Sequence, residues 1–419
     1  MKERTKTEKR VLVLNAYSRS GLAVINSLPS RYEVIGGEVE RTRHRFGRPD
    51  HFFRSQRLLA LFRYPDPVVA PQAFAEKLIE QIGIYGADAV LPAGHPVSET
   101  LAKLKGQITA ATDATILVED HVKARILFDK WETFKLCKDL GIATPDTCLA
   151  SVDGDWIETA RELNQPLVVK ARDSWGSHDV MFFDTARDAA AYLNNLPDTQ
   201  RYLPSGEDRY IVQSYTPGKQ HHVNMLCREG EALAGISEQR VCCKYDHGGP
   251  AIACLTTRIP EIIETSKSLL GGLAWNGVCQ CEFIQSEDGN FRLLECNPRI
   301  WGATALSTAA GLNIVERLVE VFVEDADPEP CFDYGVGVLY RWWFPECMQR
   351  LIQWPWTPRR LARRLREIVS RHGAVEARGN LQREDLRHLA GQILDHFSTP
   401  VIGSEMYTRE ILLRDRPDA

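Results

Sequence analysis

Two glutamates, Glu282 and Glu295, lie in a stretch whose sequence predicts a β-hairpin. Residues 278–302 approach apolar and polar alternation on both sides of Asp288-Gly289, a dipeptide typical of a two-residue turn with positive φ at both positions. If Asp288 and Gly289 are the two loop residues, Glu282 lies directly opposite Glu295 on the neighbouring strand. Directly opposed residues have Cβ atoms about 5 Å apart, where like charges destabilise a sheet. A cation is therefore expected between the two carboxylates.

The same register pairs Gln280 with Asn297, and Arg299 follows two residues later. Carboxylate and amide oxygens on rigid strands suit a hard divalent cation such as Mg²⁺, which keeps water or phosphate oxygens among its ligands. We therefore predict a metal site made of Glu282, Glu295 and Asn297. The alternative is an ordinary solvated strand pair, because a register slip of one residue would place the two carboxylates on opposite faces.

The composition indicates an ordinary globular protein, because 44% of the 419 residues are hydrophobic and 26% are charged. This length predicts roughly two to four domains. The formal net charge of −5 argues against a general nucleic-acid-binding protein, whose binding domain is usually basic. No apolar run of about 18 residues occurs, so no membrane span is expected. Eleven cysteines without a repeated Cys-x-x-Cys spacing favour a reduced, cytoplasmic protein.

The first part of the chain alternates between strand and helix patterns, which is typical of a parallel α/β domain. Apolar runs predict strands at residues 11–14, 32–35 and 87–91, and helices are predicted at residues 22–28 and around Phe74, Leu78 and Ile82. We therefore expect a βαβ domain over residues 1–120. Farther on, residues 121–140 predict one helix, and Pro166–Lys170 reads as a buried strand that ends in a cation.

From about residue 120 to residue 325 the chain resembles the ATP-grasp superfamily. The segments CEFI and LLECNPR, joined by a turn, are similar to the two strands of the metal-binding hairpin in that family. The resemblance implies that Glu282, Glu295 and Asn297 hold Mg²⁺ against the phosphates of ATP. It also implies that Arg299 contacts the phosphoryl group during transfer. Two Mg²⁺ ions are expected, and Mn²⁺ could replace them.

Two lysines match the nucleotide-contacting lysines of the family. Lys130 lies in the predicted helix at residues 121–140, and the resemblance implies that it reaches the phosphates. Lys170 ends the apolar strand at residues 166–170 and resembles the second lysine. The resemblance therefore assigns catalysis to Lys170 and Arg299.

A loop and a hinge complete the implied nucleotide site. The loop at residues 173–179 could fold backbone amides over phosphates, although it has fewer glycines than is usual in the family. Residues 210–218 resemble the hinge whose backbone contacts the adenine edge. The family often has acidic residues where this chain has glutamines, but an amide also hydrogen-bonds a ribose hydroxyl. In this region the nucleotide-binding residues are predicted to be Ser174, Gly176, Gln213, Ser214, Tyr215 and Gln220.

The resemblance implies a carboxylate–amine ligase that releases ADP and phosphate. A carboxylate, for example that of an amino acid, would attack the γ-phosphate of ATP to give an acyl phosphate, and an amine would then form the amide. The amine could belong to the same molecule, which would give a lactam, or the chain could be a nucleotide-binding sensor without catalysis. The expected partners are a small carboxylic acid and an amine, with no nucleic acid and no membrane, and the chain could form a homodimer.

Candidates for the substrate site follow from their position near the hairpin. Trp301 and Gly302 adjoin Arg299 and are predicted to line the acid pocket. Basic residues in the segment before the hairpin could hold a substrate carboxylate, although solvated surface charge is the alternative for each; they are Arg240, Lys244, His247 and Arg258.

The expected fold thus combines α/β and α+β parts. After the βαβ domain we predict an ATP-grasp subdomain A at residues 121–215 and a subdomain B, with the metal hairpin, at residues 216–325. A mixed C-terminal extension at residues 326–419 contains a basic amphipathic stretch at residues 357–371. Such helices can lie on membranes, but we prefer an outer helix with its arginines in solvent.

Overall fold

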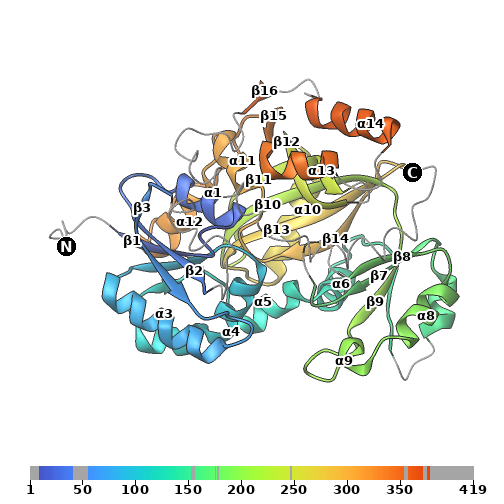
Figure 1. Cartoon of the computed structure of the whole chain (residues 1–419), viewed down its shortest axis with the longest axis horizontal. Helices are drawn as coiled ribbons and strands as arrows, with labels where there is room; N and C mark the ends of the chain where they lie inside the picture. Colours follow the sequence, from blue (N-terminus) through green and yellow to red (C-terminus); the bar gives the residue numbers. More distant parts are fainter. Residues whose placement is uncertain are drawn as a thin grey trace.

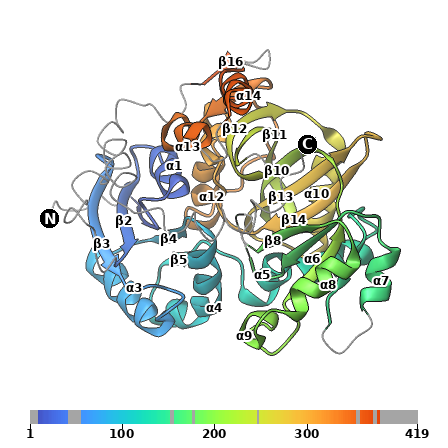
Figure 2. The same cartoon turned by 45° about the vertical axis from the view of Figure 1, so that its right-hand side comes forward.

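The structure is a computed structural model that describes residues 9–40, 55–151, 156–174, 176, 179–245, 248–352, 357–370 and 375–377. Within these residues the strands form three sheets with helices around them (Figures 1 and 2). The first sheet is parallel and the other two are mainly antiparallel, which confirms the expected combination of α/β and α+β parts. His247 and the residues after 377 lie outside the described part of the chain.

The first sheet has the strand order β3-β2-β1-β4-β5, and its strand pairs are parallel. Parallel neighbours need crossover connections, and among the described residues helices fill this role between β1 and β2, between β3 and β4, and between β4 and β5. Phe74, Leu78 and Ile82 are buried against the sheet, as the helical spacing predicts. The elements are β1 (Arg10–Leu14), α1 (Arg19–Ser27), β2 (Glu33–Val39), β3 (Leu58–Tyr64), α3 (Pro71–Tyr85), β4 (Ala89–Pro92), α4 (His95–Ala111) and β5 (Thr115–Ile116).

The third sheet is small and antiparallel, with the strand order β6-β9-β7-β8. Its buried side chains pack against α7 and α8 in a separate core. The elements in this part of the chain are α5 (His121–Phe128), α6 (Lys130–Asp139), β6 (Thr147–Leu149), α7 (Trp156–Glu162), β7 (Leu167–Ala171), β8 (Val180–Phe183), α8 (Ala186–Asn194), α9 (Asp198–Arg201) and β9 (Tyr210–Ser214).

The single helix predicted at residues 121–140 is wrong, because the chain forms two helices that meet at Asp129. The side chain of Asp129 accepts hydrogen bonds from the N–H groups of Trp131 and Glu132, so it caps the N-terminus of α6. Asp129 also forms an ion pair with Arg172, at 2.7 Å. The interruption places Lys130 at the first position of α6.

The second sheet has seven strands in the order β14-β13-β10-β11-β12-β15-β16. Long antiparallel strands form its centre, and α10 covers one of its faces, where apolar side chains of β10 and β13 pack against the helix. The elements are β10 (Gly218–Arg228), β11 (Glu231–Tyr245), β12 (Gly248–Thr257), α10 (Pro260–Gly272), β13 (Gly277–Ser286), β14 (Phe291–Asn297), α11 (Thr304–Ala309), α12 (Ile314–Val323), β15 (Val338–Arg341), the π-helix η1 (Trp343–Cys347), α13 (Met348–Ile352), α14 (Pro358–Val369) and β16 (Val375–Glu376).

The turn between β13 and β14 differs from the prediction. Ser286 N donates to Asn290 O at 3.0 Å, so three residues lie in the loop. Only Gly289 in this loop has a positive φ, of 86°. The two-residue turn with positive φ at both Asp288 and Gly289 is therefore wrong, and the loop instead places its glycine at the single left-handed position of a three-residue connection.

A β-bulge nevertheless restores the predicted pairing of the carboxylates. Near the loop Phe283 pairs with Leu293, but farther along Glu282 pairs with Glu295, which leaves Leu294 without a partner on β13. The three-residue loop shifts the strand pairing by one residue, and the extra residue in the bulge shifts it back. The two glutamates therefore face each other as predicted.

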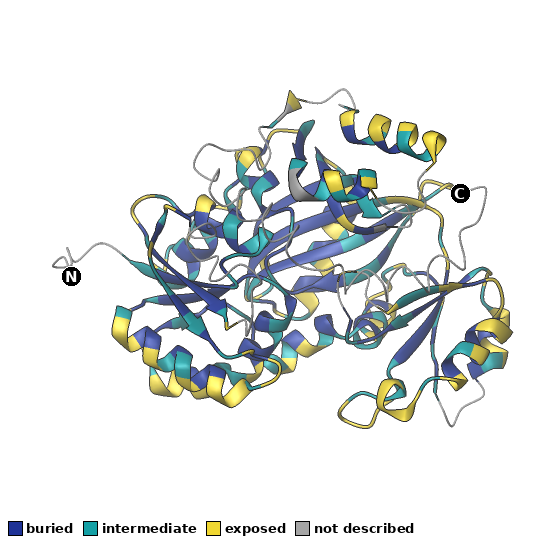
Figure 3. Cartoon of the chain, viewed as in Figure 1, coloured by how far each residue is buried: buried dark blue, intermediate teal, exposed yellow. Residues whose placement is uncertain are grey.

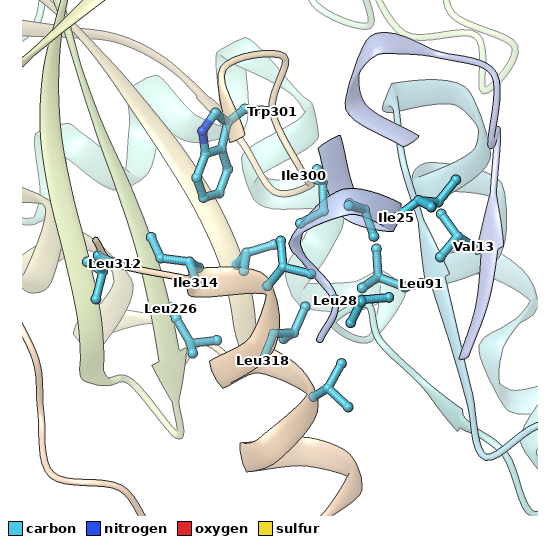
Figure 4. Close-up of a cluster of buried hydrophobic side chains, with 14 of the residues drawn as sticks. Val13, Ile25, Leu28, Leu91, Leu226, Ile300, Trp301, Leu312, Ile314 and Leu318 are labelled. Carbon is cyan, nitrogen blue, oxygen red and sulfur yellow. The ribbon is translucent and has the colours of Figure 1, made fainter. Parts of the chain in front are cut away.

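Figure 3 shows buried residues along the strands and exposed residues on the outer faces of the helices. The first and second sheets are joined by an apolar cluster in which Ile25 of α1 and Leu28, directly after α1, meet Ile314 and Leu318 of α12 (Figure 4). Ile300, directly after Arg299, belongs to the same cluster. This packing fixes the chain that follows the hairpin against the first sheet.

The basic helix near the C-terminus, α14, differs from the prediction in the face that it buries. Arg364 and Ile368 are buried, whereas Leu365 and Val369 are exposed to 42% and 60%. The expectation that its arginines lie in solvent is thus wrong for Arg364. Among the described residues, no helix combines the length and the apolar composition that crossing a bilayer requires.

Candidate functional site

A row of ionisable side chains crosses the second sheet on one face. His222 on β10 pairs with Glu238 on β11 and with Glu282 on β13, and Glu282 in turn pairs with Glu295 on β14. Directly paired residues point to the same face of a sheet, so the four side chains line up. We call Glu238, His222, Glu282 and Glu295 the polar row.

Asn297 links the polar row to Arg299. Its Nδ2 donates to Glu282 Oε1 at 2.9 Å, and its Oδ1 accepts from Arg299 Nη2 at 2.9 Å. Arg299 Nη1 donates to Ile300 O at 3.1 Å. Burial lowers the pKa of Arg299, and the nearby Glu282 and Glu295 carboxylates oppose that shift. The structure therefore brings together the four residues predicted for the metal and the phosphoryl group.

The two predicted lysines approach the same carboxylates from the side of the third sheet. Lys130 Nζ donates to the backbone oxygen of Ser174 and lies 3.8 Å from Glu295 Oε2. Lys170 Nζ donates to Gln213 Oε1 at 2.7 Å. Burial lowers the pKa of Lys170 to about 8, with Glu295 opposing the shift and Lys130 adding to it. Two cations thus stand beside the carboxylate pair, where phosphate oxygens would need them.

Most polar groups of the predicted hinge residues Gln213, Ser214 and Tyr215 already form hydrogen bonds with other parts of the protein. Gln213 Nε2 donates to Thr147 Oγ1 at 2.9 Å, so both ends of this amide are occupied. The N–H groups of Ser214 and Tyr215 donate to backbone oxygens at 2.9 and 2.8 Å. The Ser214 hydroxyl is buried without a partner among the described residues, whereas Tyr215 is 42% exposed.

The remaining nucleotide candidates are Gln220 and Gly176. Gln220 is half-buried on β10, where it pairs with Ile284. Gly176 is exposed and has a φ of 63°, a conformation that favours glycine. This glycine is part of the loop that was expected to cover phosphates, and Trp175, Ser177 and His178 of that loop lie outside the described residues.

Of the basic substrate candidates, the structure brings Arg240 to the polar row. Its Nη1 lies 3.8 Å from Glu282 Oε2, and its Nη2 donates to Gly249 O. Arg258 is instead exposed and contacts Asp333 at 3.4 Å. Lys244 lies 5.4 Å from the ring centre of Tyr245. Neither of these two residues contacts the carboxylate pair.

The two residues after Ile300 have different surroundings from those expected. Trp301 is fully buried in the cluster between the first and second sheets, so it is a core residue and the prediction that it lines a pocket is wrong (Figure 4). Gly302 packs against Arg19, because a Cβ atom at this position would lie 2.5 Å from Arg19 Nη2. Arg19 also stacks 4.1 Å from the ring centre of Trp342.

Two members of the polar row, His222 and Glu238, were not predicted from the sequence. One signal was available, because Gln220, His222 and Asn224 are polar at alternate positions of β10 and must share a face. That pattern predicts a polar face but not its neighbours. Only the pairing of β10 with β11 and β13 places the histidine between two carboxylates.

The donor set fits a divalent metal ion. Among the described residues, no hydrogen bond reaches the Glu295 carboxylate, and its nearest cation lies 3.8 Å away. Glu282 Oε2 has cationic or imidazole nitrogens only at 3.6 and 3.8 Å. Because the nearest nitrogen atoms lie beyond hydrogen-bond distance of these oxygens, the two opposed carboxylates have room for an ion coordinated by oxygen. Asn297 Oδ1 can join them, because a carbonyl oxygen has a second lone pair besides the one that Arg299 uses.

A second group of potential ligands lies on the opposite face of the hairpin. The sulfurs of Cys279, Cys281 and Cys296 lie within 4.8 Å of one another. All three are buried in the apolar core beneath α10. Buried cysteines in such surroundings act as small apolar side chains, so we assign them to packing.

Comparisons with known proteins agree with this geometry. Residues 127–303 match the family model described as an ATP-grasp domain. A D-alanine–D-alanine ligase from Pseudomonas putida is 24% identical over 214 residues, which are 48% of this chain and 64% of that protein. The chain thus spans less than two thirds of the length of this curated relative.

Two solved structures share the fold. The biotin carboxylase domain of the 2-oxoglutarate carboxylase from Hydrogenobacter thermophilus, in complex with MgADP, ADP and bicarbonate, superposes with a TM-score of 0.62 at 13% identity, covering 79% of this chain and 73% of that one. An L-amino acid ligase from Bacillus licheniformis gives a TM-score of 0.55 at 13% identity, covering 76% and 75%. The matched residues include the hairpin and both lysines, and this part of the chain, residues 127–303, matches the ATP-grasp domain family.

Proposed function

We propose that this protein is an ATP-dependent ligase that joins a small carboxylic acid, such as an amino acid, to an amine and releases ADP and phosphate. The observation that carries the proposal is the carboxylate pair with Lys130, Lys170 and Arg299 around it. Relatives named as a D-alanine–D-alanine ligase and an L-amino acid ligase support an amino acid as the acid.

The residues of the site suit phosphoryl transfer, which needs positioning and charge neutralisation more than covalent chemistry. Lys130 and Lys170 hold negative charge of the nucleotide phosphates beside Glu295. Arg299, fixed by Asn297, donates to oxygens of the phosphoryl group as charge develops on them. A Mg²⁺ ion bound by Glu282, Glu295 and Asn297 would supply further positive charge at the outer phosphates.

The reaction proposed for this site has two steps. The carboxylate oxygen of the acid forms a bond to the γ-phosphorus of ATP while the bond to ADP breaks, which gives an acyl phosphate. The amine nitrogen then attacks the acyl carbon, and inorganic phosphate leaves with the bonding electron pair. The amine loses a proton in this step, so one amide, one ADP and one phosphate are formed for each ATP.

Chromatography of the nucleotides after turnover tests the proposal. Paired amino acids are screened for phosphate release, and the active pair is then analysed. We expect ADP and phosphate in equal amount to the amide, and a hydroxamate when hydroxylamine replaces the amine. AMP and pyrophosphate as the main products would contradict the acyl-phosphate mechanism. An absence of ATP consumption with every acid would instead favour a nucleotide-binding sensor.

A further inference from the structure

We propose that Glu346 recognises the acid substrate by accepting hydrogen bonds from a free ammonium group on it, so that the acid is an amino acid whose own amino group does not react. The inference rests on the proposed ligase function and deepens it, because the choice of an amino acid there rests on the relatives alone. It makes Glu346 a specificity-determining residue of the acid pocket. It also excludes a lactam formed with this amino group.

Glu346 lies on the π-helix η1 and carries a carboxylate that receives no hydrogen bond from another described residue. Its Oε2 is buried without a partner, and the nearest cation, Arg19 Nη1, lies 3.9 Å from its Oε1, beyond hydrogen-bond distance. The side chain is nevertheless 16% exposed, so it can be reached from outside the core. A largely buried carboxylate without donors is costly and needs an explanation. A ligand that brings N–H donors provides one, and π-helical turns are frequent at functional sites.

The guanidinium group of Arg19 is held away from Glu346 by three contacts. It lies 4.1 Å from the ring centre of Trp342, and its Nη1 donates to Ala251 O at 2.8 Å. Its Nη2 packs against Gly302, where a Cβ atom would lie only 2.5 Å away. Arg19 therefore places positive charge near the Glu346 carboxylate without satisfying its oxygens.

The contact between Arg19 and Gly302 places Glu346 near the phosphoryl site. Gly302 follows Arg299 by three residues, which span at most about 10 Å even when extended. This short segment is fixed, because Ile300 is buried in the cluster between the first and second sheets. An acid whose carboxylate meets the phosphoryl group at Arg299 therefore lies close to the pocket wall that Arg19 and Glu346 form.

Arg240 approaches the same wall from the side of the carboxylate pair. Its Nη1 lies 3.8 Å from Glu282 Oε2. Arg240 and Arg19 donate to backbone oxygens that are two residues apart on β12, those of Gly249 and Ala251. Two residues correspond to about 7 Å along an extended strand, so the two guanidinium groups are neighbours. Contacts thus lead from Glu282 through two cations to Glu346, and a zwitterion fits this order of charges, with its carboxylate at the cations and its ammonium group at Glu346.

The chemistry assigns this ammonium group to the acid and not to the amine. The amine must lose a proton before its nitrogen can attack the acyl carbon. A carboxylate beside an ammonium group favours the charged form, so Glu346 would slow a reacting amine. Glu346 therefore suits an amino group that stays protonated throughout the reaction.

The electrostatics of Glu346 agree with a cationic ligand. Burial raises the pKa of Glu346, and the charges of Arg19 and Lys244 oppose this shift. An ammonium group in hydrogen-bond contact with the carboxylate opposes it further, because it stabilises the ionised form. Binding of the ammonium group thereby compensates the cost of burying the carboxylate.

The experiment measures hydroxamate formation with the full chain and ATP. Hydroxylamine is uncharged at neutral pH and replaces the amine in every assay, so only the acid is tested. The common amino acids, in both enantiomers, are compared with the matching 2-hydroxy acids, for example alanine with lactate and phenylalanine with phenyllactate. The members of each pair have nearly the same shape and differ in charge. We expect kcat/KM for the preferred amino acid to exceed that for its 2-hydroxy acid by roughly 30-fold or more, the scale for losing one partner of a buried charge pair.

Variants assign this preference to one residue. Glu346→Gln keeps the shape of the side chain and removes its charge, so the preference should fall to about 3-fold or less. Glu346→Asp keeps the charge and should retain part of the preference. Glu231→Gln, at the exposed start of β11, is the control and should behave as the wild-type protein. Thermal unfolding checks that each variant is folded, and the ratio of two substrates measured on one preparation does not depend on its folded fraction.

The outcomes separate this inference from the proposed function. A purely structural role of Glu346 would lower kcat/KM for both acids equally, and an unchanged ratio in Glu346→Gln would overturn the inference. Equal use of amino and 2-hydroxy acids by the wild-type protein would overturn it too, and so would hydroxamate from acids without an amino group but from no amino acid. In each of these cases the ligase proposal stands. An absence of hydroxamate and ADP with every acid would overturn the proposed function and this inference with it.

Discussion

Lys130 Nζ lies 3.8 Å from Glu295 Oε2, and this contact connects α6, beside the third sheet, with β14 at the edge of the second sheet (Figure 1). Lys130 is buried, and its own backbone N–H donates to the backbone oxygen of Arg172, two residues after Lys170, at 3.2 Å. These contacts hold Lys130 of α6, and β7 with Lys170, near the Glu295 carboxylate on β14. A nucleotide whose phosphates lie between the two sheets would contact both.

The first prediction concerns Glu295. The substitution Glu295→Gln removes one charge of the carboxylate pair, so it should abolish turnover while relieving like-charge repulsion in the folded protein. We expect phosphate release to fall to background while the protein stays folded, because the loss of repulsion from Glu282 offsets the loss of the ion pair with Lys130. Glu287→Gln, in the exposed loop of the same hairpin, is the control and should retain activity. Wild-type turnover in Glu295→Gln would contradict the metal assignment.

The second prediction concerns Arg299. If its guanidinium meets charge that develops during transfer, Arg299→Ala should lower kcat by about 10²-fold or more, with a smaller effect on the KM for ATP. Arg299→Lys should recover little of the loss, because an ammonium lacks the planar pair of donors. Steady-state kinetics with the matched substrates checks this. An effect confined to KM would make Arg299 a residue of ground-state binding.

The third prediction concerns the protonation of Lys170. Because burial lowers its pKa from 10.5 to about 8, the free protein holds this lysine partly neutral above pH 8. Bound phosphates favour the charged form, so ATP binding near pH 8.5 should take up a proton and should weaken as the pH rises further. Calorimetry in buffers of different ionisation enthalpy measures the uptake. Lys170→Gln should abolish it, and the exposed Lys103→Gln should not.

The lowered pKa of Lys170 also determines whether the free energy of unfolding rises or falls with pH. Between about pH 8 and pH 10.5 the unfolded chain carries a proton on Lys170 that the folded chain has lost. This group therefore makes the free energy of unfolding rise with pH in that window. Denaturant unfolding of wild-type protein and Lys170→Gln, without nucleotide, measures the difference, and equal slopes against pH would contradict the lowered pKa.

The fourth prediction concerns Gly302. A Cβ atom here would lie 2.5 Å from Arg19 Nη2, so Gly302→Ala should displace Arg19 from its stacking on Trp342. We expect a loss of about 1 kcal/mol or less in the free energy of unfolding, at the low end for overpacking, because the new Cβ atom meets the end of a flexible side chain. Gly106→Ala is the control, because it lies within α4 with no atom near the new Cβ, and it should stabilise the helix by up to about 1 kcal/mol. Urea unfolding compares the two.

The sequence alone predicted the hairpin and the pairing of its two glutamates, whereas the pairs nearer to the loop are shifted by one residue from the predicted register. Alternation along the strands and a glycine-containing turn are local properties, so they predicted that Glu282 meets Glu295. The turn itself was wrong. The bulge at Leu294 could not be predicted, because whether an extra residue lies in a loop or in a strand depends on how the strand packs against its neighbours.

Only the tertiary structure decided what surrounds the carboxylate pair. The sequence contains no local signal that β10 pairs with β13, because pairing between distant strands depends on how the whole sheet buries its apolar face. That strand order places His222 between Glu238 and Glu282. The tertiary structure also decided the surroundings of Trp301, whose position two residues after Arg299 in the chain suggested a pocket. The backbone turns Trp301 into the core between two sheets, where burial of a large apolar ring is favoured.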